Sequence, residues 1–302
     1  MALGYDKSLY ILAFDHRGSF QKKFFGIVGQ PSPEEADRIS DAKSVIAEGF
    51  FEAVEDGAPK EFCGLLVDEQ FGADIARRAK KEGFNFAMPV EKTGQDEFDF
   101  DYGEDFGAHI EEFDPTFSKV LVRYNPEGDA EMNAQQVGRL RRLSDWLHER
   151  DRKFLFELLV PAEQPQLEKV GGDADRYDKE LRPDLMLVAI TELQDAGVEP
   201  DIWKIEGLDK KEDCERIAKQ VRSGGRDQVA CVVLGRGADE AAVVHWLHQG
   251  SGVPGYIGFA IGRTIWRDAL KAYVDGNSKR EEASAAISAN YRRMIDAYNQ
   301  AG

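Results

Sequence analysis

Eight short apolar segments recur along the chain, and longer charged segments with helical spacing lie between them. The apolar segments are rich in Val, Ile, Leu and Phe, and they have the length of strands buried on both faces. Helical spacing is clearest in residues 33–54, 134–150, 182–197 and 238–250. An eightfold alternation of strand and helix predicts a single (β/α)8 barrel. The expected strands lie within residues 8–15, 62–70, 85–92, 118–125, 152–160, 201–208, 228–236 and 255–263.

The length of 302 residues fits one large barrel or two ordinary domains. No linker or low-complexity tract divides the chain, so we expect residues 1–302 to form one domain; a doubly wound open sheet is the alternative. Two connections are longer than the others, residues 93–114 after the third strand and residues 161–180 after the fifth. In a barrel both would lie at the C-terminal face, either as loops that cover a ligand or as surface decoration.

Composition excludes several classes of function. The net charge of −17 would repel nucleic acids and anionic lipids, so an anionic ligand needs a local cationic pocket. No apolar run reaches the roughly 18 residues that a membrane span needs, and no basic segment precedes a long apolar one at the N-terminus. The three cysteines, Cys63, Cys214 and Cys231, are too scattered for a disulfide framework. We therefore expect a cytoplasmic protein with a small-molecule ligand and no nucleic-acid or membrane partner, and leave a homo-oligomer open.

Charged residues interrupt or end every apolar segment. Because an unpaired buried charge is costly, these groups must meet one another, water or a ligand, and a barrel would gather them at one mouth. The residues are Asp15, Asp68, Glu69, Glu91, Lys92, Lys119, Arg123, Glu157, Lys204, Glu206, Arg236 and Arg263.

Lys204 lies in the segment DIWKIEGL, where strand alternation points Ile202, Lys204 and Glu206 into the barrel. It could form a buried ion pair with Glu206 or Glu157. It could also be a nucleophile that forms a Schiff base with a carbonyl substrate, which requires an amine with a lowered pKa. Partial burial and a neighbouring cation can lower that pKa, and Lys119 is placed to be the cation.

Two carboxylates accompany the lysines. Glu157 lies among large apolar residues in KFLFELLVP, where it is either the counter-ion of a buried lysine or a general acid and base whose pKa burial raises. Asp15 precedes HRGSF and is either a helix cap or a group that orients a substrate hydroxyl at the barrel mouth. The position of Asp15 in the sequence does not distinguish between its two alternatives.

The seventh and eighth segments end alike, in LGRG (residues 234–237) and IGRT (residues 261–264). Gly235 and Gly262 would expose backbone N–H groups, and Arg236 and Arg263 would add two guanidinium groups, a combination suited to phosphate. The alternative is two turns whose arginines pair with the abundant carboxylates. Arg17 and Lys92, at the ends of the first and third segments, are further candidates for binding the substrate.

Metal chemistry has little support. Only His16 lies at a strand end; His109, His148, His245 and His248 fall on predicted helices. His245 and His248 have i, i+3 spacing but no further ligand in prospect, so packing or surface roles are expected. No metal and no cofactor is predicted.

Long motifs across the chain resemble the 2-deoxy-5-keto-gluconate 6-phosphate aldolase domain family of inositol catabolism, which is often fused behind a sugar kinase. They are AFDHRGSF, VEKTGQ, KVLVRYNPEGD, FELLVP, IWKIEGLD, VLGRGAD and GFAIGRTIW. The chain is also similar to the wider class I group that contains tagatose 1,6-bisphosphate aldolase and sulfofructose phosphate aldolase.

The resemblance implies a metal-independent lyase on a (β/α)8 barrel. Lys204 would form the imine, and Lys119 would be the second active-site lysine. Glu157 would be the acid and base, and Asp15 would contact a substrate hydroxyl. Arg263 and Gly262 would bind phosphate.

One departure concerns the seventh segment. The tagatose group has a serine and small residues where this chain has Leu234, Gly235 and Arg236. That departure argues against a bisphosphate and makes Arg236 a candidate for a substrate carboxylate. The expected reaction is cleavage of 2-deoxy-5-keto-gluconate 6-phosphate to dihydroxyacetone phosphate and malonate semialdehyde. The alternatives are aldol cleavage of another sugar phosphate and a non-catalytic sugar-phosphate-binding barrel that regulates a partner kinase.

Overall fold

A computed structural model describes residues 3–300, so the outermost residues of the predicted domain lie outside it. Eight parallel strands pair in sequence order, and β1 also pairs with β8, which closes the barrel. This confirms the predicted (β/α)8 fold and excludes the open doubly wound sheet. The strands are β1 (Leu9–Ala13), β2 (Cys63–Leu66), β3 (Asn85–Pro89), β4 (Phe117–Arg123), β5 (Lys153–Leu159), β6 (Ile202–Glu206), β7 (Ala230–Leu234) and β8 (Tyr256–Ile261). Seven lie inside their predicted segments, and β4 begins one residue before its segment.

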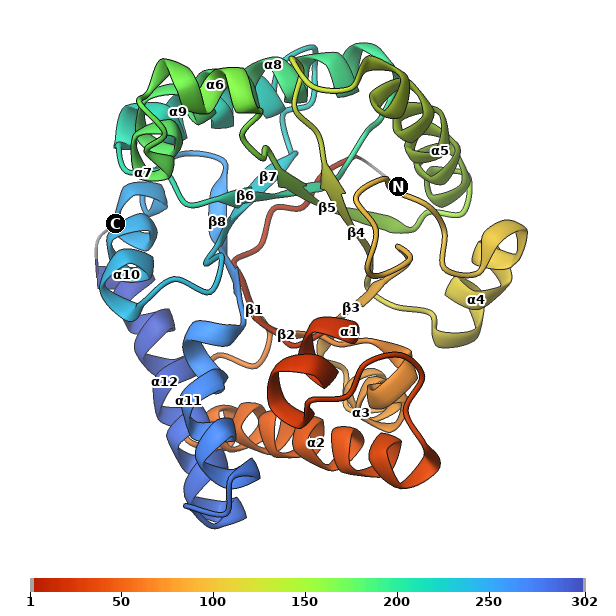
Figure 1. Cartoon of the computed structure of the whole chain (residues 1–302), viewed down its shortest axis with the longest axis vertical. Coiled ribbons are helices and arrows are strands. Elements are labelled where there is room, and N and C mark those ends of the chain that lie inside the picture. Colours follow the sequence, from red (N-terminus) through yellow and green to blue (C-terminus); the bar gives the residue numbers. More distant parts are fainter. Residues whose placement is uncertain (1–2, 301–302) are drawn as a thin grey trace.

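Helices surround the barrel as an outer ring (Figure 1). The longer ones are α2 (Pro33–Glu55), α3 (Glu69–Lys81), α5 (Ala130–His148), α8 (Arg182–Asp195), α9 (Lys211–Val221), α10 (Glu240–Gly250), α11 (Arg263–Val274) and α12 (Arg280–Gln300). The last helix, α12, lies against α2 and α11, so the two ends of the chain complete the ring together (Figure 1). In residues 3–300, the structure has no helix with both the length and the apolar character of a membrane span.

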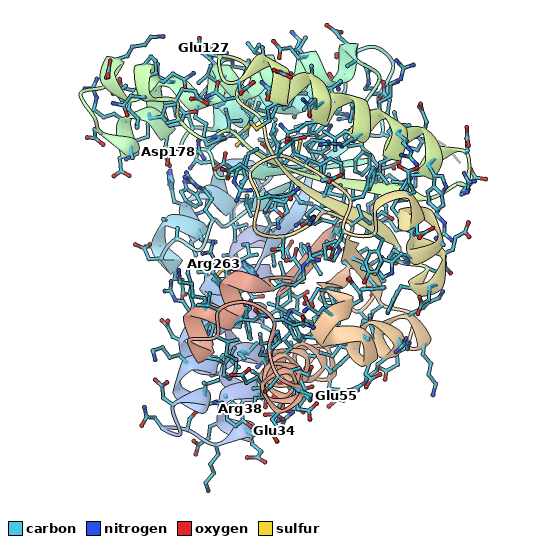
Figure 2. All side chains as sticks on the ribbon, turned by 45° about the vertical axis from the view of Figure 1, so that its right-hand side comes forward. Glu34, Arg38, Glu55, Glu127, Asp178 and Arg263 are labelled. Carbon is cyan, nitrogen blue, oxygen red and sulfur yellow. The ribbon has the colours of Figure 1, made fainter. Side chains whose placement is uncertain are left out.

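Alternation along the strands separates two buried clusters. Ile202 packs with apolar side chains inside the barrel, whereas Trp203 packs in the larger layer between strands and helices. The inner cluster also holds Leu9, Ile11, Ala13, Leu66, Ala87, Phe117, Leu155, Val232 and Ala260. Side chains therefore occupy the space that the ribbon leaves open inside the barrel (Figure 2).

The two long connections are partly folded. Residues 93–114 contain η2 (Gly103–Asp105) and α4 (Phe106–Phe113), and Glu91 forms an isolated bridge with Phe100. Residues 161–180 contain α6 (Gln164–Lys169), α7 (Ala174–Arg176) and most of η3 (Tyr177–Leu181). The first connection, after β1, carries the short helices α1 (Gly18–Phe20) and η1 (Gln21–Phe25), which lie at one end of the barrel (Figure 1).

Candidate active site

A cavity of about 730 Å³ lies at the C-terminal ends of the strands. Its walls come from strand ends and from the connection after β5, which contributes residues between Val160 and Asp178. Cationic side chains in this lining outnumber carboxylates by seven to five, although the whole chain has an excess of acidic residues. The cavity therefore suits an anionic ligand. The cations are Arg17, Lys23, Lys119, Arg123, Lys204, Arg236 and Arg263, and the carboxylates are Asp15, Glu91, Glu157, Asp178 and Glu206.

Lys204 points into the barrel, as alternation predicted. It is 3% exposed and lines the cavity floor with Glu157, its direct partner in the register of β6 and β5. The Nζ atom of Lys204 donates to Oε2 of Glu157 at 2.9 Å. The buried ion pair expected as one alternative is thus present with Glu157.

Lys119 contacts three carboxylates. Its Nζ atom lies 2.9 Å from Asp15 Oδ2, 2.7 Å from Glu91 Oε1 and 3.1 Å from Glu157 Oε2. Burial alone would lower the pKa of Lys119, but these three carboxylates raise it well above its ordinary value. Lys119 is therefore a fixed positive charge beside Lys204.

The pKa of Glu157 differs from the expectation. Burial alone would raise this pKa, but the ammonium groups of Lys119 and Lys204 outweigh burial and lower it. Of the two alternatives for Glu157, the counter-ion of a buried lysine is therefore present, whereas a pKa raised by burial is not. Glu157 is therefore a carboxylate in the free protein at neutral pH.

Asp15 and His16 follow β1 at the cavity wall. Burial would raise the pKa of Asp15, but Lys119, His16 and Lys204 lower it below its ordinary range. Burial lowers the pKa of His16 to about 4. Asp15 acts to raise this pKa, and the positive charges of Arg263, Lys204 and Lys43 act to lower it. At neutral pH this side of the cavity presents a carboxylate and a neutral imidazole.

Strand two does not bring its charged groups to the cavity lining. Asp68 forms an ion pair with Lys43 of α2 in which both side chains are fully buried, and its other oxygen accepts from the Phe71 N–H at the start of α3. Lys43 also donates to the backbone oxygens of Phe14 and His16. The expectation that every strand adds a charge at one mouth is therefore wrong for β2, because Asp68 caps a helix.

Glu91, rather than Lys92, reaches the site from the end of β3. Ala87 faces the barrel interior, so alternation carries Pro89 and Glu91 inward and turns Lys92 outward. Lys92 is exposed and lies outside the cavity lining. The structure therefore does not place Lys92 with the other candidates, and the same alternation rule could have identified Glu91.

Gly262 and Arg263 form one end of the cavity. Gly262 precedes α11, and no side chain caps the first N–H groups of this helix. A Cβ atom at position 262 would lie 2.2 Å from the Ala13 backbone oxygen, so this position requires glycine. Arg263 donates to the Arg236 backbone oxygen at 2.7 Å and, within residues 3–300, pairs with no carboxylate. Burial and Arg267 lower the pKa of Arg263, because both disfavour its charged form. An anion bound beside Arg263 would stabilise that charged form.

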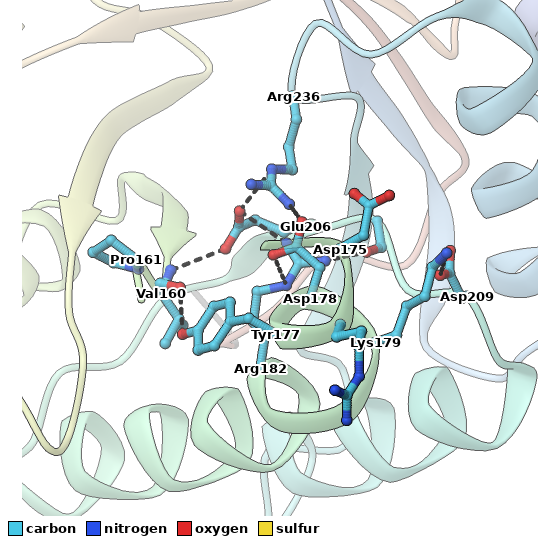
Figure 3. Close-up of polar contacts among 12 residues, drawn as sticks. Val160, Pro161, Asp175, Tyr177, Asp178, Lys179, Arg182, Glu206, Asp209 and Arg236 are labelled. Atoms are coloured by element: carbon cyan, nitrogen blue, oxygen red, sulfur yellow. Dashed lines mark hydrogen bonds and ion pairs between the residues drawn. The ribbon is translucent and has the colours of Figure 1, made fainter. Parts of the chain in front are cut away.

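Gly235 and Arg236 also line the cavity, but Arg236 is paired. Its Nε atom lies 3.0 Å from Oε1 of Glu206, and its Nη1 group donates to Asp178 of η3 (Figure 3). The two glycine-arginine turns that looked alike in sequence thus differ: the alternative of carboxylate pairing holds for Arg236.

Arg17 lies at the cavity edge and is also engaged. Its Nη1 group donates to Asp101 at 2.5 Å, and Nη2 donates to the Glu91 backbone oxygen at 2.5 Å. Arg17 is 4% exposed. It ties the connection after β3 to the end of β1 and leaves Nε without a hydrogen-bond partner.

The side chains that could bind a metal ion do not cluster in the part of the chain that the structure describes. In residues 3–300 no three His, Cys, Asp or Glu side chains form a group able to hold a metal ion. Of the helical histidines, His109 stacks on Tyr102, His148 lies near Asp201, and His245 and His248 are exposed on α10.

The chain belongs to the family described as "Uncharacterized protein conserved in bacteria (DUF2090)", whose model matches residues 4–302. No curated protein sequence matches it significantly.

Two solved structures are similar to the chain in fold. The Cgl0159 protein of Corynebacterium glutamicum has a TM-score of 0.57 and 16% identity, covering 95% of this chain and 88% of its own. An archaeal fructose 1,6-bisphosphate aldolase has a TM-score of 0.56 and 14% identity, covering 94% of each chain. At these identities the likeness establishes the barrel fold alone.

Proposed function

We propose that this member of the DUF2090 family is a class I aldolase in which Lys204 forms an imine with a ketone substrate. One observation carries the proposal: a buried lysine at the floor of a cation-rich cavity contacts one carboxylate, Glu157, which can accept its proton. Class I aldolase chemistry needs this combination of an enclosed amine and a positioned acid and base.

Lys204 suits the nucleophilic role better than Lys119. Lys119 is held charged by three carboxylates, and a charged amine does not attack a carbonyl. Within residues 3–300, Lys204 has one ion pair, with Glu157, and this carboxylate can accept its proton.

Glu157 would move the proton at each step. Lys204 transfers a proton to Glu157, and the neutral amine attacks the ketone carbon. A second proton moves from the nitrogen to the oxygen, which gives a carbinolamine. Glu157 then returns the first proton to the departing hydroxyl, so that water leaves and an iminium remains on Lys204.

The same carboxylate then removes the proton from the hydroxyl two carbons from the imine carbon. The bond between the hydroxyl-bearing carbon and the carbon next to the imine breaks. An aldehyde leaves, and an enamine remains on Lys204. Glu157 protonates the enamine carbon, and one water hydrolyses the resulting iminium. The water released at the start balances the water consumed at the end.

The proposed substrate is 2-deoxy-5-keto-gluconate 6-phosphate, in agreement with the family resemblance. Its phosphate would bind at Gly262 and Arg263, where an uncapped helix N-terminus meets a guanidinium that has no carboxylate partner in residues 3–300. Its carboxylate would bind at Arg236. The products would be dihydroxyacetone phosphate and malonate semialdehyde.

Product analysis in the presence of a chelator tests this assignment. We expect the keto-acid phosphate to yield the two products without added metal. Tagatose 1,6-bisphosphate is the comparison substrate. Turnover of the bisphosphate alone would reassign the substrate, and turnover of neither compound would contradict the aldolase proposal for these sugars.

A further inference from the structure

A charged network at the cavity wall joins strand ends to the connection after β5 (Figure 3). It contains two arginines, Arg182 and Arg236, and two carboxylates, Asp178 and Glu206. The charges balance within the network. Three of the four residues line the cavity; Arg182 lies behind them.

The two carboxylates are anchored to different extents. Oε1 of Glu206 lies 2.9 Å from Arg182 Nη1 and 3.0 Å from Arg236 Nε, and Oε2 accepts from the Val160 N–H at 2.9 Å. Glu206 is 4% exposed. Asp178 contacts Arg236 and lies 3.4 Å from Arg182 Nε, and its side chain is 25% exposed. Glu206 is a fixed part of the wall, whereas Asp178 is the more accessible anion.

The elements that carry Asp178 and Arg236 are both unusual in conformation. Asp178 lies in η3, a single π-helical turn, which is a rare form that is frequent at functional sites. Arg236 has a left-handed backbone with φ of 52°, although it is not glycine. Such a backbone is retained when the surroundings fix it, and it aims this guanidinium toward Asp178 and Glu206.

We infer that Asp178 occupies a carboxylate subsite on Arg236 in the free protein, and that the carboxylate of the substrate displaces it there. Exchange of one carboxylate for another preserves the charge balance with Arg182 and Glu206. Arg236 is 35% exposed and lines the cavity, so a ligand can reach it. Displacement of Asp178 would break the contact between η3 and the loop after β7, which couples ligand binding to the position of this segment.

The inference rests on the proposed function, because the keto-acid substrate supplies the carboxylate. It predicts that Asp178 competes with ligand. Asp178→Asn keeps the shape of the side chain but weakens its bond to Arg236, since a charge-assisted hydrogen bond becomes a neutral one. Carboxylate binding should then become tighter by about tenfold to a hundredfold.

The experiment is a calorimetric titration with 3-hydroxypropanoate, a monocarboxylate that has no ketone or aldehyde group and therefore cannot form an imine. Asp178→Asn should bind it about tenfold or more tightly than the wild type does, and Arg236→Gln should lose binding. Asp175→Asn is the matched control, because it removes the same charge from α7 without a contact to Arg236. This control should bind like the wild type.

Inorganic phosphate forms the second arm of the titration. Its affinity should be the same in the wild type and in Asp178→Asn, since phosphate is assigned to Arg263. A gain for phosphate in place of the carboxylate would overturn the inference, as would equal carboxylate affinity in the wild type, Asp178→Asn and Asp175→Asn. Because the titration requires no turnover, its failure is distinguishable from failure to form an imine.

Discussion

Oε2 of Glu157 accepts a hydrogen bond from Nζ of Lys204 at 2.9 Å, across directly paired positions of β5 and β6. A second lysine, Lys119, lies 3.1 Å from the same oxygen. The carboxylate is thus placed to exchange a proton with Lys204, the proposed nucleophile, and the charged Lys119 lies beside both. Neighbouring strands of a barrel produce this arrangement with no contribution from loops.

Glu157→Gln should remove the acid and base while Lys204 stays in place. We expect kcat to fall by about a hundredfold or more with a smaller change in KM, because proton transfer contributes to the chemical steps. Steady-state kinetics check this. Glu168→Gln, an exposed change on α6 at the same end of the barrel, should retain wild-type kcat. Equal kcat in the Glu157 variant and the wild type would exclude the proposed role.

Arg263→Gln should weaken phosphate binding. The expected change is a rise of about tenfold or more in KM for the phosphorylated substrate and in the inhibition constant of inorganic phosphate, since a charge-assisted contact is lost. The control is Arg267→Gln on the same helix, where the arginine is exposed. If both variants bind phosphate equally well, the phosphate site lies elsewhere.

His16 gives the protein a specific dependence of stability on pH. Its pKa is about 4 in the folded protein and about 6.5 in the unfolded chain, so the unfolded state binds more protons between these values. The free energy of unfolding should therefore fall as pH is lowered from 6.5 to 4, by up to about 3 kcal/mol from this residue.

Urea unfolding across this pH range measures the effect. His16→Gln should flatten the curve between pH 4 and 6.5, and His248→Gln, at an exposed position on α10, is the matched control. A wild-type slope in the His16 variant would contradict the assigned burial.

The buried pair of Lys43 and Asp68 should be costly to break from one side. Lys43→Met leaves an unpaired buried carboxylate and should lower the free energy of unfolding by about 3–5 kcal/mol. The double variant Lys43→Met/Asp68→Asn should recover part of that loss, because no buried charge remains. Urea unfolding of the three proteins checks this, and an undiminished loss in the double variant would show that the charge is not the cause.

The fold and the inward direction of Lys204 could be predicted because both follow from local periodicity. Eight buried strands read as eight apolar runs, and alternation within DIWKIE placed Lys204 inside and Trp203 outside. The same rule applied to the third predicted strand would have selected Glu91 over Lys92. That error came from choosing by charge rather than by register.

The remaining features depend on contacts between distant segments. The lowered pKa of Glu157 requires knowledge that Lys119 and Lys204 meet one of its oxygens. The pairing of Arg236 with Asp178 joins residues 58 positions apart and depends on how the connection after β5 folds. Asp178 has no local sequence signal, since acidic residues are abundant throughout this chain.

The most direct test of the account is reduction with borohydride during incubation with the keto-acid phosphate, followed by mass spectrometry of the digested protein. The account predicts a stable adduct on the peptide that contains Lys204, and none in Lys204→Met. An adduct on Lys119, or no adduct while substrate is being turned over, would contradict the assignment of Lys204 as the imine-forming residue.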